Sequence, residues 1–276
     1  ALHLAVNPPL DIPESSGITE GAQKDTIVIP FNDLDEARKK LKNENVAAVI
    51  VEPVLGAGGG IPADKEFLKG LRELCHEKDA LLIFDEIVTG FRLAPGGAQQ
   101  YYGVLPDITI LGKIMGGGFT IGAIASRREV MEHMDPLLYE RPKFSFHGGT
   151  FCANPVSATA GLTTLKLLED GHVLNQLNRL GDKIRKQLRD IFEERNVDVY
   201  ITGVSSIFQT HFTREEVRDV QSAFQADRKT LTNYHMHLIA NGVFFLPKKI
   251  GVLCRAHTKE DINKFLLETE NYAKKI

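Results

Sequence analysis

Three short runs of apolar residues constrain the fold more than any other feature of this sequence. The runs are residues 46–51, 80–84 and 108–111, and each is bounded by polar turns. Continuous apolar runs of this length are typical of strands that are buried on both faces of a sheet. Residues 64–76, between the first two runs, carry apolar side chains at helical spacing, so a helix would cross from one strand to the next. The sequence therefore predicts an α/β fold with a mainly parallel central sheet covered by helices.

The C-terminal part of the chain has a different pattern. Apolar residues from Val173 onward recur at helical spacing and predict a long amphipathic helix. Beyond it we expect strands at 197–202 and 207–212, a helix at 222–240, strands at 242–246 and 252–255, and a closing helix that Thr258 and Asp261 cap. Residues 1–172 are therefore predicted to be part of a large domain. Residues 173–276 are predicted to form a linking helix and a small α+β domain.

Composition and charge argue against several classes of protein. Of the 276 residues, 43% are hydrophobic and 25% are charged, which is typical of globular proteins. The net charge is −3 and no stripe of basic residues interleaves with aromatic residues, so the sequence shows no electrostatic footprint for a nucleic acid. No apolar run approaches the roughly 20 residues that cross a bilayer, and residues 1–10 lack the features of a secretory signal. We expect a cytoplasmic protein with neither a nucleic-acid partner nor a membrane partner.

The cysteines suggest neither disulfides nor a metal. Cys75, Cys152 and Cys254 are odd in number, and none of them has the spacing of a CxxC motif or of a Cys/His zinc site. We therefore expect reduced, buried thiols and no bound metal ion.

Two charged residues directly follow the predicted strands. Asp85 comes after the run 80–84, and Lys113 follows the run 108–111, with three glycines at 116–118 just beyond. Carboxyl ends of parallel strands meet at one edge of a sheet, where α/β proteins bind ligands, so both side chains would emerge there. One interpretation is a structural ion pair. The other is a pyridoxal phosphate (PLP) enzyme, which needs one lysine for a Schiff base and one carboxylate to keep the pyridine nitrogen protonated.

Several segments around these two residues resemble a known family. In chain order they are VEPV at 51–54, FDEIVTGFR at 84–92, GAQ at 97–99, PD at 106–107, GK at 112–113, GGG at 116–118, GT at 149–150 and NP at 154–155. Together they resemble the class III aminotransferases, closest to glutamate-1-semialdehyde 2,1-aminomutase and its relatives. The resemblance extends from about residue 13 to the closing helix and rests on many separate motifs.

This resemblance implies a fold-type I PLP enzyme, a homodimer with its active sites at the subunit interface. Lys113 would form the Schiff base with PLP and move a proton between the substrate carbon and C4′ of the cofactor, while Asp85 would hold the pyridine nitrogen. Ile87 would pack against one face of the ring, and Thr150 would contact the cofactor phosphate of the neighbouring subunit. Other interpretations stay open for the last two, Ile87 as an ordinary core residue and Thr150 as the cap of a helix near Asn154.

The sequence also departs from the family. The family has, ahead of the position matching Ala1, a segment whose turn binds the cofactor phosphate, so we expect this chain to lack that turn. Ala57 stands where aminomutases usually have Asn, and residues 247–252 lack a Glu that is usual there. These differences favour an aminotransferase that moves an amino group between a small amino acid or amino ketone and an oxo acceptor. The alternatives are glutamate-1-semialdehyde aminomutase and a non-catalytic fragment.

Overall fold

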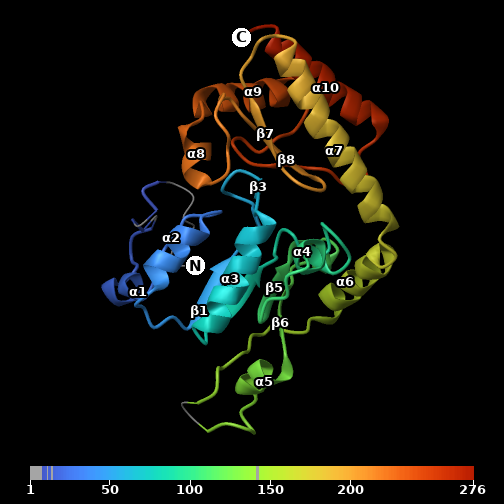
Figure 1. Ribbon diagram of the computed structural model, residues 1–276. Coiled ribbons are helices and arrows are strands. Elements are labelled where there is room, and N and C mark those ends of the chain that lie inside the picture. Colours follow the sequence, from blue (N-terminus) through green and yellow to red (C-terminus); the bar gives the residue numbers. More distant parts are fainter. Residues whose placement is uncertain (1–7, 11, 14, 141–142) are drawn as a thin grey trace. The chain divides into compact units, whose positions relative to one another are not determined.

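The computed structural model describes residues 8–10, 12–13, 15–140 and 143–276 (Figure 1). Residues 1–7 lie outside the described part. They are among the residues on which the expectation of no secretory signal rests. Among the described residues, no helix combines the length and the apolar character needed to cross a membrane.

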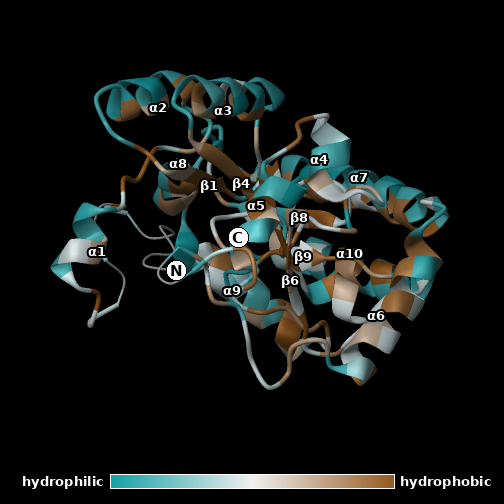
Figure 2. Ribbon diagram, turned by 90° about the horizontal axis from the view of Figure 1, so that it is seen from below, coloured by the Kyte–Doolittle hydropathy of each residue, from teal (hydrophilic) through white to brown (hydrophobic). Residues whose placement is uncertain are grey.

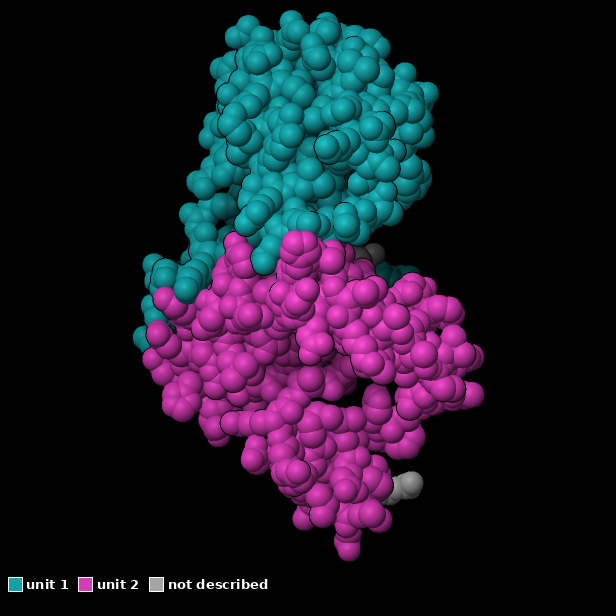
Figure 3. Space-filling model, turned by 90° about the vertical axis from the view of Figure 1, so that its right-hand side faces the viewer, with its two compact units in different colours: residues 1–44, 54–67, 175–276 teal, residues 45–53, 68–174 magenta. Residues whose placement is uncertain are grey.

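The chain divides into two compact units, shown in different colours in Figure 3. Unit 1 combines residues 1–44, 54–67 and 175–276, and unit 2 combines residues 45–53 and 68–174. Each unit is therefore assembled from segments that are far apart in the sequence. The functional division between residues 1–172 and 173–276 stays a prediction.

Unit 2 contains a four-stranded sheet with the strand order β1-β4-β5-β6. The strands are β1 (Ala48–Val51), β4 (Leu81–Asp85), β5 (Ile108–Gly112) and β6 (Gly122–Ser126). The pairs β1–β4 and β4–β5 are parallel, and β6 runs antiparallel to β5. The predicted α/β fold with a mainly parallel sheet is confirmed. Strand β6 was not predicted, because its small residues form no apolar run.

The helices of this part begin with α3 (Lys65–Glu77), whose first three residues are counted with unit 1. This helix confirms the predicted crossover helix between β1 and β4. The others are α4 (Gly97–Tyr102), the 3-10 helix η1 (Lys113–Gly116), α5 (Arg128–Met131), the 3-10 helix η2 (Glu132–Met134) and α6 (Pro155–Leu168). In Figure 2 most of the α3 ribbon has the colour of hydrophilic residues, whereas the ribbons of β1 and β4 have the colour of hydrophobic residues. Arg72 of α3 donates to the Asp107 carboxylate at 2.5 Å, and the amide of Leu82 donates to the same oxygen at 2.8 Å. These bonds tie the helix to the strands.

Unit 1 is built around two antiparallel sheets and a cluster of apolar side chains. The strands are β2 (Val54–Leu55), β3 (Ile61–Pro62), β7 (Tyr200–Thr202), β8 (Ile207–His211) and β9 (Gly251–Val252). The helices are α1 (Glu20–Lys24), α2 (Leu34–Leu41), α7 (His172–Glu193), α8 (Val220–Gln225), α9 (Arg228–Ala240) and α10 (Lys259–Ala273). The predicted long helix is α7, and its Ile184, Leu188 and Phe192 are fully buried in the cluster. The capping box formed by Thr258 and Asp261 at the start of α10 is also as predicted.

The single helix predicted at 222–240 is wrong, because α8 and α9 are separate helices. The chain leaves the helical conformation at Ala226, and Asp227 then caps a new helix. The Asp227 carboxylate accepts hydrogen bonds from the amides of Lys229 and Thr230, at 2.9 and 3.0 Å. Asp227 was therefore the sequence signal for the start of a second helix. The helical spacing of the apolar residues, which continues across it, hid this signal.

The strand predicted at 242–246 is also wrong, since no strand forms over these residues, all of which the structure describes. The amide of Val243 instead donates to the carbonyl of Leu238 at 2.9 Å and closes the end of α9. Further along, the amide of Lys248 donates to Nδ1 of His235 at 2.9 Å. The strand predicted at 252–255 is reduced to β9.

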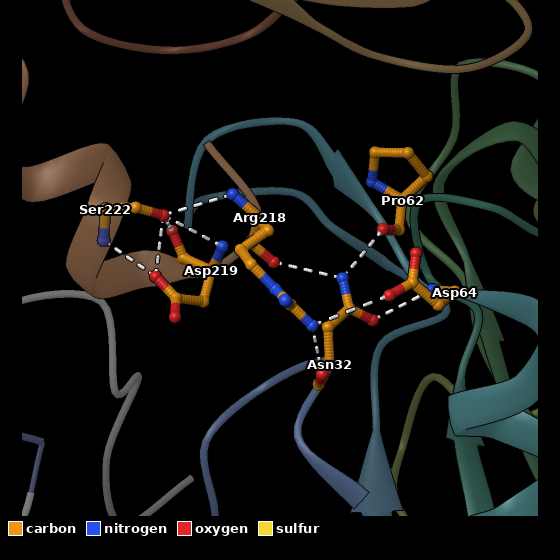
Figure 4. A network of polar contacts seen from close by, with 6 residues as sticks. All are labelled: Asn32, Pro62, Asp64, Arg218, Asp219 and Ser222. Carbon is orange, nitrogen blue, oxygen red and sulfur yellow. Dashed lines mark hydrogen bonds and ion pairs between the residues drawn. The ribbon is translucent and has the colours of Figure 1, made fainter. Parts of the chain in front are cut away.

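A buried asparagine joins three segments of unit 1 (Figure 4). Asn32, which is 6% exposed, donates from Nδ2 to the carbonyls of Pro62, at 3.3 Å, and Arg218, at 3.0 Å. Its Oδ1 accepts the amide of Asp64 at 2.8 Å, and its carbonyl accepts the Arg218 guanidinium at 2.7 Å. The end of the β2–β3 hairpin is therefore fixed to the loop before α8.

A buried histidine fixes the other end of the same hairpin. Thr202 donates from Oγ1 to the carbonyl of Gly59 at 2.6 Å, and Nε2 of His211 lies 3.1 Å from the same oxygen. A Cβ on Gly59, whose φ is +122°, would lie 3.0 Å from the His211 ring, so a side chain there would crowd the ring. Burial lowers the pKa of His211 from 6.5 to about 4, although the hydrogen bond to Gly59 acts in the opposite direction.

This histidine predicts an acid-sensitive fold. The folded-state pKa of His211 is below the unfolded value, so its contribution is fully present above about pH 6.5 and is lost as the pH falls toward 4, by about 3 kcal/mol. Urea unfolding at several pH values would measure this loss for the native protein and for His211→Gln, whose amide can still donate to Gly59. The free energy of unfolding of the variant should depend less on pH. The difference in slope corresponds to about one proton fewer taken up on unfolding. Equal pH dependence in both proteins would rule out this role.

Candidate active site

Asp85 ends strand β4 at the carboxyl edge of the parallel sheet. It pairs with Ile110 of β5 and is half-buried. One carboxylate oxygen accepts the amide of Ile87 at 3.1 Å. The other oxygen forms no hydrogen bond with any residue that the structure describes. Asp85 is therefore held in place and still has one oxygen available to a ligand.

Lys113 follows β5 directly, at the same edge of the sheet as Asp85. Its backbone has a φ of 49°, in the left-handed region that residues other than glycine seldom adopt. Such a conformation costs on the order of 1–3 kcal/mol and is typical of functional sites. Over the described part of the chain, the Lys113 ammonium has no hydrogen-bond or ion-pair partner. A strained, exposed and unpaired lysine is suited to reaction with a ligand.

Ile87 lies beside these two residues. A Cβ built on Gly112 would lie 3.6 Å from Cγ2 of Ile87, so this side chain is next to the residue that precedes Lys113. The structure thus brings Asp85, Ile87 and Lys113 to one edge of the sheet.

The glycines after Lys113 allow η1 to pack closely on α6. Gly117 has a φ of +57°, and a Cβ there would clash with Thr164 and with the carbonyl of Ala160. A Cβ on Gly161 of α6 would clash with the carbonyl of Met115. Because Gly117 and Gly161 have no side chain, the backbones of η1 and α6 approach each other closely.

Thr150 is exposed in a turn and does not cap the following helix. Asn154 is the cap of α6, because its Oδ1 accepts the amides of Val156 and Ser157 at 3.0 and 3.2 Å. The interpretation of Thr150 as a helix cap is therefore wrong. No described contact joins Thr150 to Asp85 or Lys113.

The cysteines only partly match the expectation of buried thiols. Cys75 is buried, and burial raises the pKa of its thiol to about 11. Cys152 and Cys254 are exposed, which contradicts the prediction. Both lie in loops, where the sequence pattern carries no information on burial. Across the described ranges, no group of three or more His, Cys, Asp or Glu side chains is arranged to hold a metal ion.

The sequence did not single out Glu86, which is fully buried next to Asp85. Its carboxylate accepts hydrogen bonds from residues 98 and 99 at the start of α4. The sequence does not indicate whether a charged residue directly after an apolar strand is buried or exposed. The GAQ motif at 97–99 was the only signal available, and it was assigned no role.

Comparisons with known proteins agree with this geometry. The family described as aminotransferase class-III matches residues 5–250. The glutamate-1-semialdehyde 2,1-aminomutase of Methanothermobacter thermautotrophicus is 42% identical over 263 residues, which cover 94% of this chain and 61% of that protein. The chain thus spans about three fifths of the length of the curated relatives it matches.

Two solved structures are similar over nearly the whole chain. An omega-transaminase from Sphaerobacter thermophilus has a TM-score of 0.88 at 32% identity, covering 95% of this chain and 60% of that one. A glutamate-1-semialdehyde aminomutase from Pseudomonas aeruginosa in complex with PMP has a TM-score of 0.81 at 26% identity, covering 95% and 59%. The expected resemblance and the fold-type I architecture are confirmed. The chain belongs to the class III aminotransferase family.

Proposed function

We propose that the protein carrying this sequence is a PLP-dependent aminotransferase, which moves an amino group between a small amino acid or amino ketone and an oxo acceptor. The observation that carries this proposal is the pair Asp85 and Lys113 at neighbouring strand ends, each with a polar group that has no partner among the described residues. The free carboxylate oxygen fits a protonated pyridine nitrogen, and the free ammonium of Lys113 fits a reactive aldehyde. The side chains present therefore suit PLP.

The chemistry of these residues follows from their positions. When bound, PLP supplies an electron sink for the bonding pair released at the substrate carbon. The carboxylate of Asp85 would hold a proton at the pyridine nitrogen. The hydrogen bond that this carboxylate accepts from the amide of Ile87 fixes its orientation. Nζ of Lys113 moves a proton at the carbon that carries the substrate amino group. The Ile87 side chain would pack against one face of the ring and exclude water there.

We further propose that the protein is a cytoplasmic homodimer and that Thr150 serves the cofactor phosphate of the neighbouring subunit. The exposed hydroxyl of Thr150, in a turn ahead of α6, supports this role, because hydroxyls and free amides there suit phosphate oxygens. In this arrangement, residues 1–172 contribute the PLP-binding part and residues 173–276 contribute the small domain.

Mixing two inactive variants tests the role of Thr150. Lys113→Ala and Thr150→Glu should each be inactive, the second because a carboxylate repels the phosphate. If Thr150 acts across the interface, a mixed dimer has one site with both native residues, and random exchange should restore about a quarter of the native activity. Dimers that form without any recovered activity would show that Thr150 does not act on the partner's site.

A second candidate function is the aminomutase reaction, an exchange of positions within glutamate-1-semialdehyde. The 42% identity to a curated aminomutase favours it. Ala57, in place of the usual Asn, and the likeness to an omega-transaminase favour the transferase. A third possibility is a non-catalytic protein that binds no PLP.

One set of assays separates these functions. The purified protein is mixed with PLP, and its visible absorbance is recorded before and after an amino donor is added. A transferase turns over only with an oxo acceptor, whereas a mutase isomerises the semialdehyde without one. The absence of any protein-bound PLP band would refute both enzymatic functions and leave the non-catalytic one.

A further inference from the structure

Glu86 is held at several points on the side of the sheet opposite Asp85. Glu86 directly follows β4, and its amide continues the hydrogen bonding with β5, so its side chain points away from the Asp85 carboxylate as successive residues of an extended chain do. Glu86 is 0% exposed. Its amide donates to the carbonyl of Ile110 on β5 at 2.9 Å, and its carbonyl accepts the amide of Gly90 at 2.8 Å. The backbone next to Asp85 is thus fixed on both sides.

The Glu86 carboxylate is surrounded by hydrogen-bond donors. One oxygen accepts the amide of Ala98 at 2.5 Å and the hydroxyl of Thr89 at 3.1 Å. The other accepts the amide of Gln99 at 3.2 Å and its side-chain Nε2 at 3.3 Å. A carboxylate has about four acceptor positions, and this environment fills them.

Gln99 extends this network to the neighbouring strand. Its Nε2 also lies 3.3 Å from Oγ1 of Thr109, a residue of β5 that is 5% exposed. A partly buried chain of hydrogen bonds therefore runs from Glu86 through Gln99 to Thr109. It cross-links the strand that ends in Asp85 to the strand that leads to Lys113.

Gly97 makes room for the network. Its φ is +71°, and a Cβ there would clash with the Glu86 carboxylate. The GAQ motif at 97–99 thus has a structural meaning. The glycine admits the carboxylate, the Ala98 amide binds it, and Gln99 connects it to β5.

We infer that Glu86 and Gln99 are positioning residues, which set the direction of Asp85 and its alignment with Lys113 from the opposite face of the sheet. This inference rests on the proposed function, because it takes the network to serve cofactor binding. Misplacing a reacting group by about 1 Å can cost about a hundredfold in rate, so such a support has a measurable effect. The three hydrogen bonds that the Glu86 carboxylate accepts from Ala98 and Gln99 also hold the start of α4 against the end of β4.

Gln99→Met is the most informative variant. Glu86→Gln would place the side-chain NH2 group of glutamine next to the buried donors that now bind the carboxylate. Because one of the two carboxylate oxygens would no longer be there to accept those hydrogen bonds, we expect this variant to unfold. Gln99→Met keeps the side-chain length and removes only the bonds from Nε2 to Glu86 and Thr109. The matched control is Gln100→Met, an exposed glutamine of the same helix whose side chain accepts the amide of Gly96, at 2.6 Å, and has no other hydrogen bond with the described residues.

The first measurement needs no cofactor. The amide of Ile87 donates to the Asp85 carboxylate, so its hydrogen-exchange rate reports where that carboxylate lies. In the cofactor-free full chain, Gln99→Met should raise this rate about tenfold, and Gln100→Met should leave it unchanged. An Ile87 exchange rate that is equal in the native protein and Gln99→Met would overturn the inference.

The second measurement is the dissociation constant of PLP, taken from its visible absorbance. Gln99→Met should weaken binding about tenfold in the native background and less than about twofold in Asp85→Asn, because it acts through Asp85. Equal weakening in both backgrounds would mean that Gln99 has a general structural role and would overturn the inference. A native protein that binds no PLP would refute the proposed function, and the exchange rate of Ile87 would then decide the inference alone.

Discussion

Replacing Lys113 with alanine should lower amino-group transfer by about 10⁴-fold or more, the upper range for loss of a positioned acid–base group. Lys113 is the only lysine placed at the carboxyl edge of the sheet within the described ranges, beside Asp85 and Ile87. Under the proposed mechanism, its loss removes both the covalent link and the group that moves the proton. Some PLP should remain bound, because the proposed ring contacts of Asp85 and Ile87 do not involve Lys113.

Turnover and bound cofactor are measured together for this variant. The control is Lys143→Ala, an exposed lysine that does not directly follow a strand and should keep native activity. Lys113 is itself exposed, and alanine relieves little of its backbone strain, so the melting temperature should change little. Native turnover in Lys113→Ala would contradict the proposed mechanism.

Asp85→Asn should be the next most damaging change and should lower turnover by about 10³-fold. A neutral amide cannot hold a proton on the pyridine nitrogen, so the ring loses the positive charge that draws electrons from the substrate carbon. The side-chain oxygen that remains in this variant would still accept the amide of Ile87, so the local fold should persist. Asp85→Glu should recover little activity, because the added methylene displaces the carboxylate.

Steady-state kinetics and a pH titration of the bound cofactor's absorbance check this role. The loss should appear in kcat rather than in KM, because the carboxylate acts in the transition state. A pairing of Asp85 with the pyridine nitrogen also requires the spectrum of Asp85→Asn to differ from that of the native protein. Unimpaired turnover in Asp85→Asn would eliminate the pairing.

The central sheet and its two charged strand ends could be predicted because the signals are local. The apolar runs at 80–84 and 108–111 mark strands buried on both faces, and parallel pairing then brings Asp85 and Lys113 to one edge. That edge position follows from topology and needs no knowledge of side-chain contacts.

The features that the sequence did not reveal depend on tertiary contacts. Strand β6 is built of small residues and becomes a strand only through its pairing with β5. Residues 242–246 have strand-like composition, but capping of α9 and the bond between Lys248 and His235 hold them in a loop. In the sequence, Glu86 cannot be distinguished from an exposed glutamate. Only the folded structure surrounds its carboxylate with hydrogen-bond donors.

The most direct test of the central claim is to identify the lysine that holds the cofactor. The protein is incubated with PLP, reduced with borohydride to make any covalent link permanent, and digested for mass spectrometry. The account predicts that the cofactor is attached to the peptide containing Lys113, and that Lys113→Ala abolishes this label. A label on another lysine, or none in a protein that binds PLP, would contradict it.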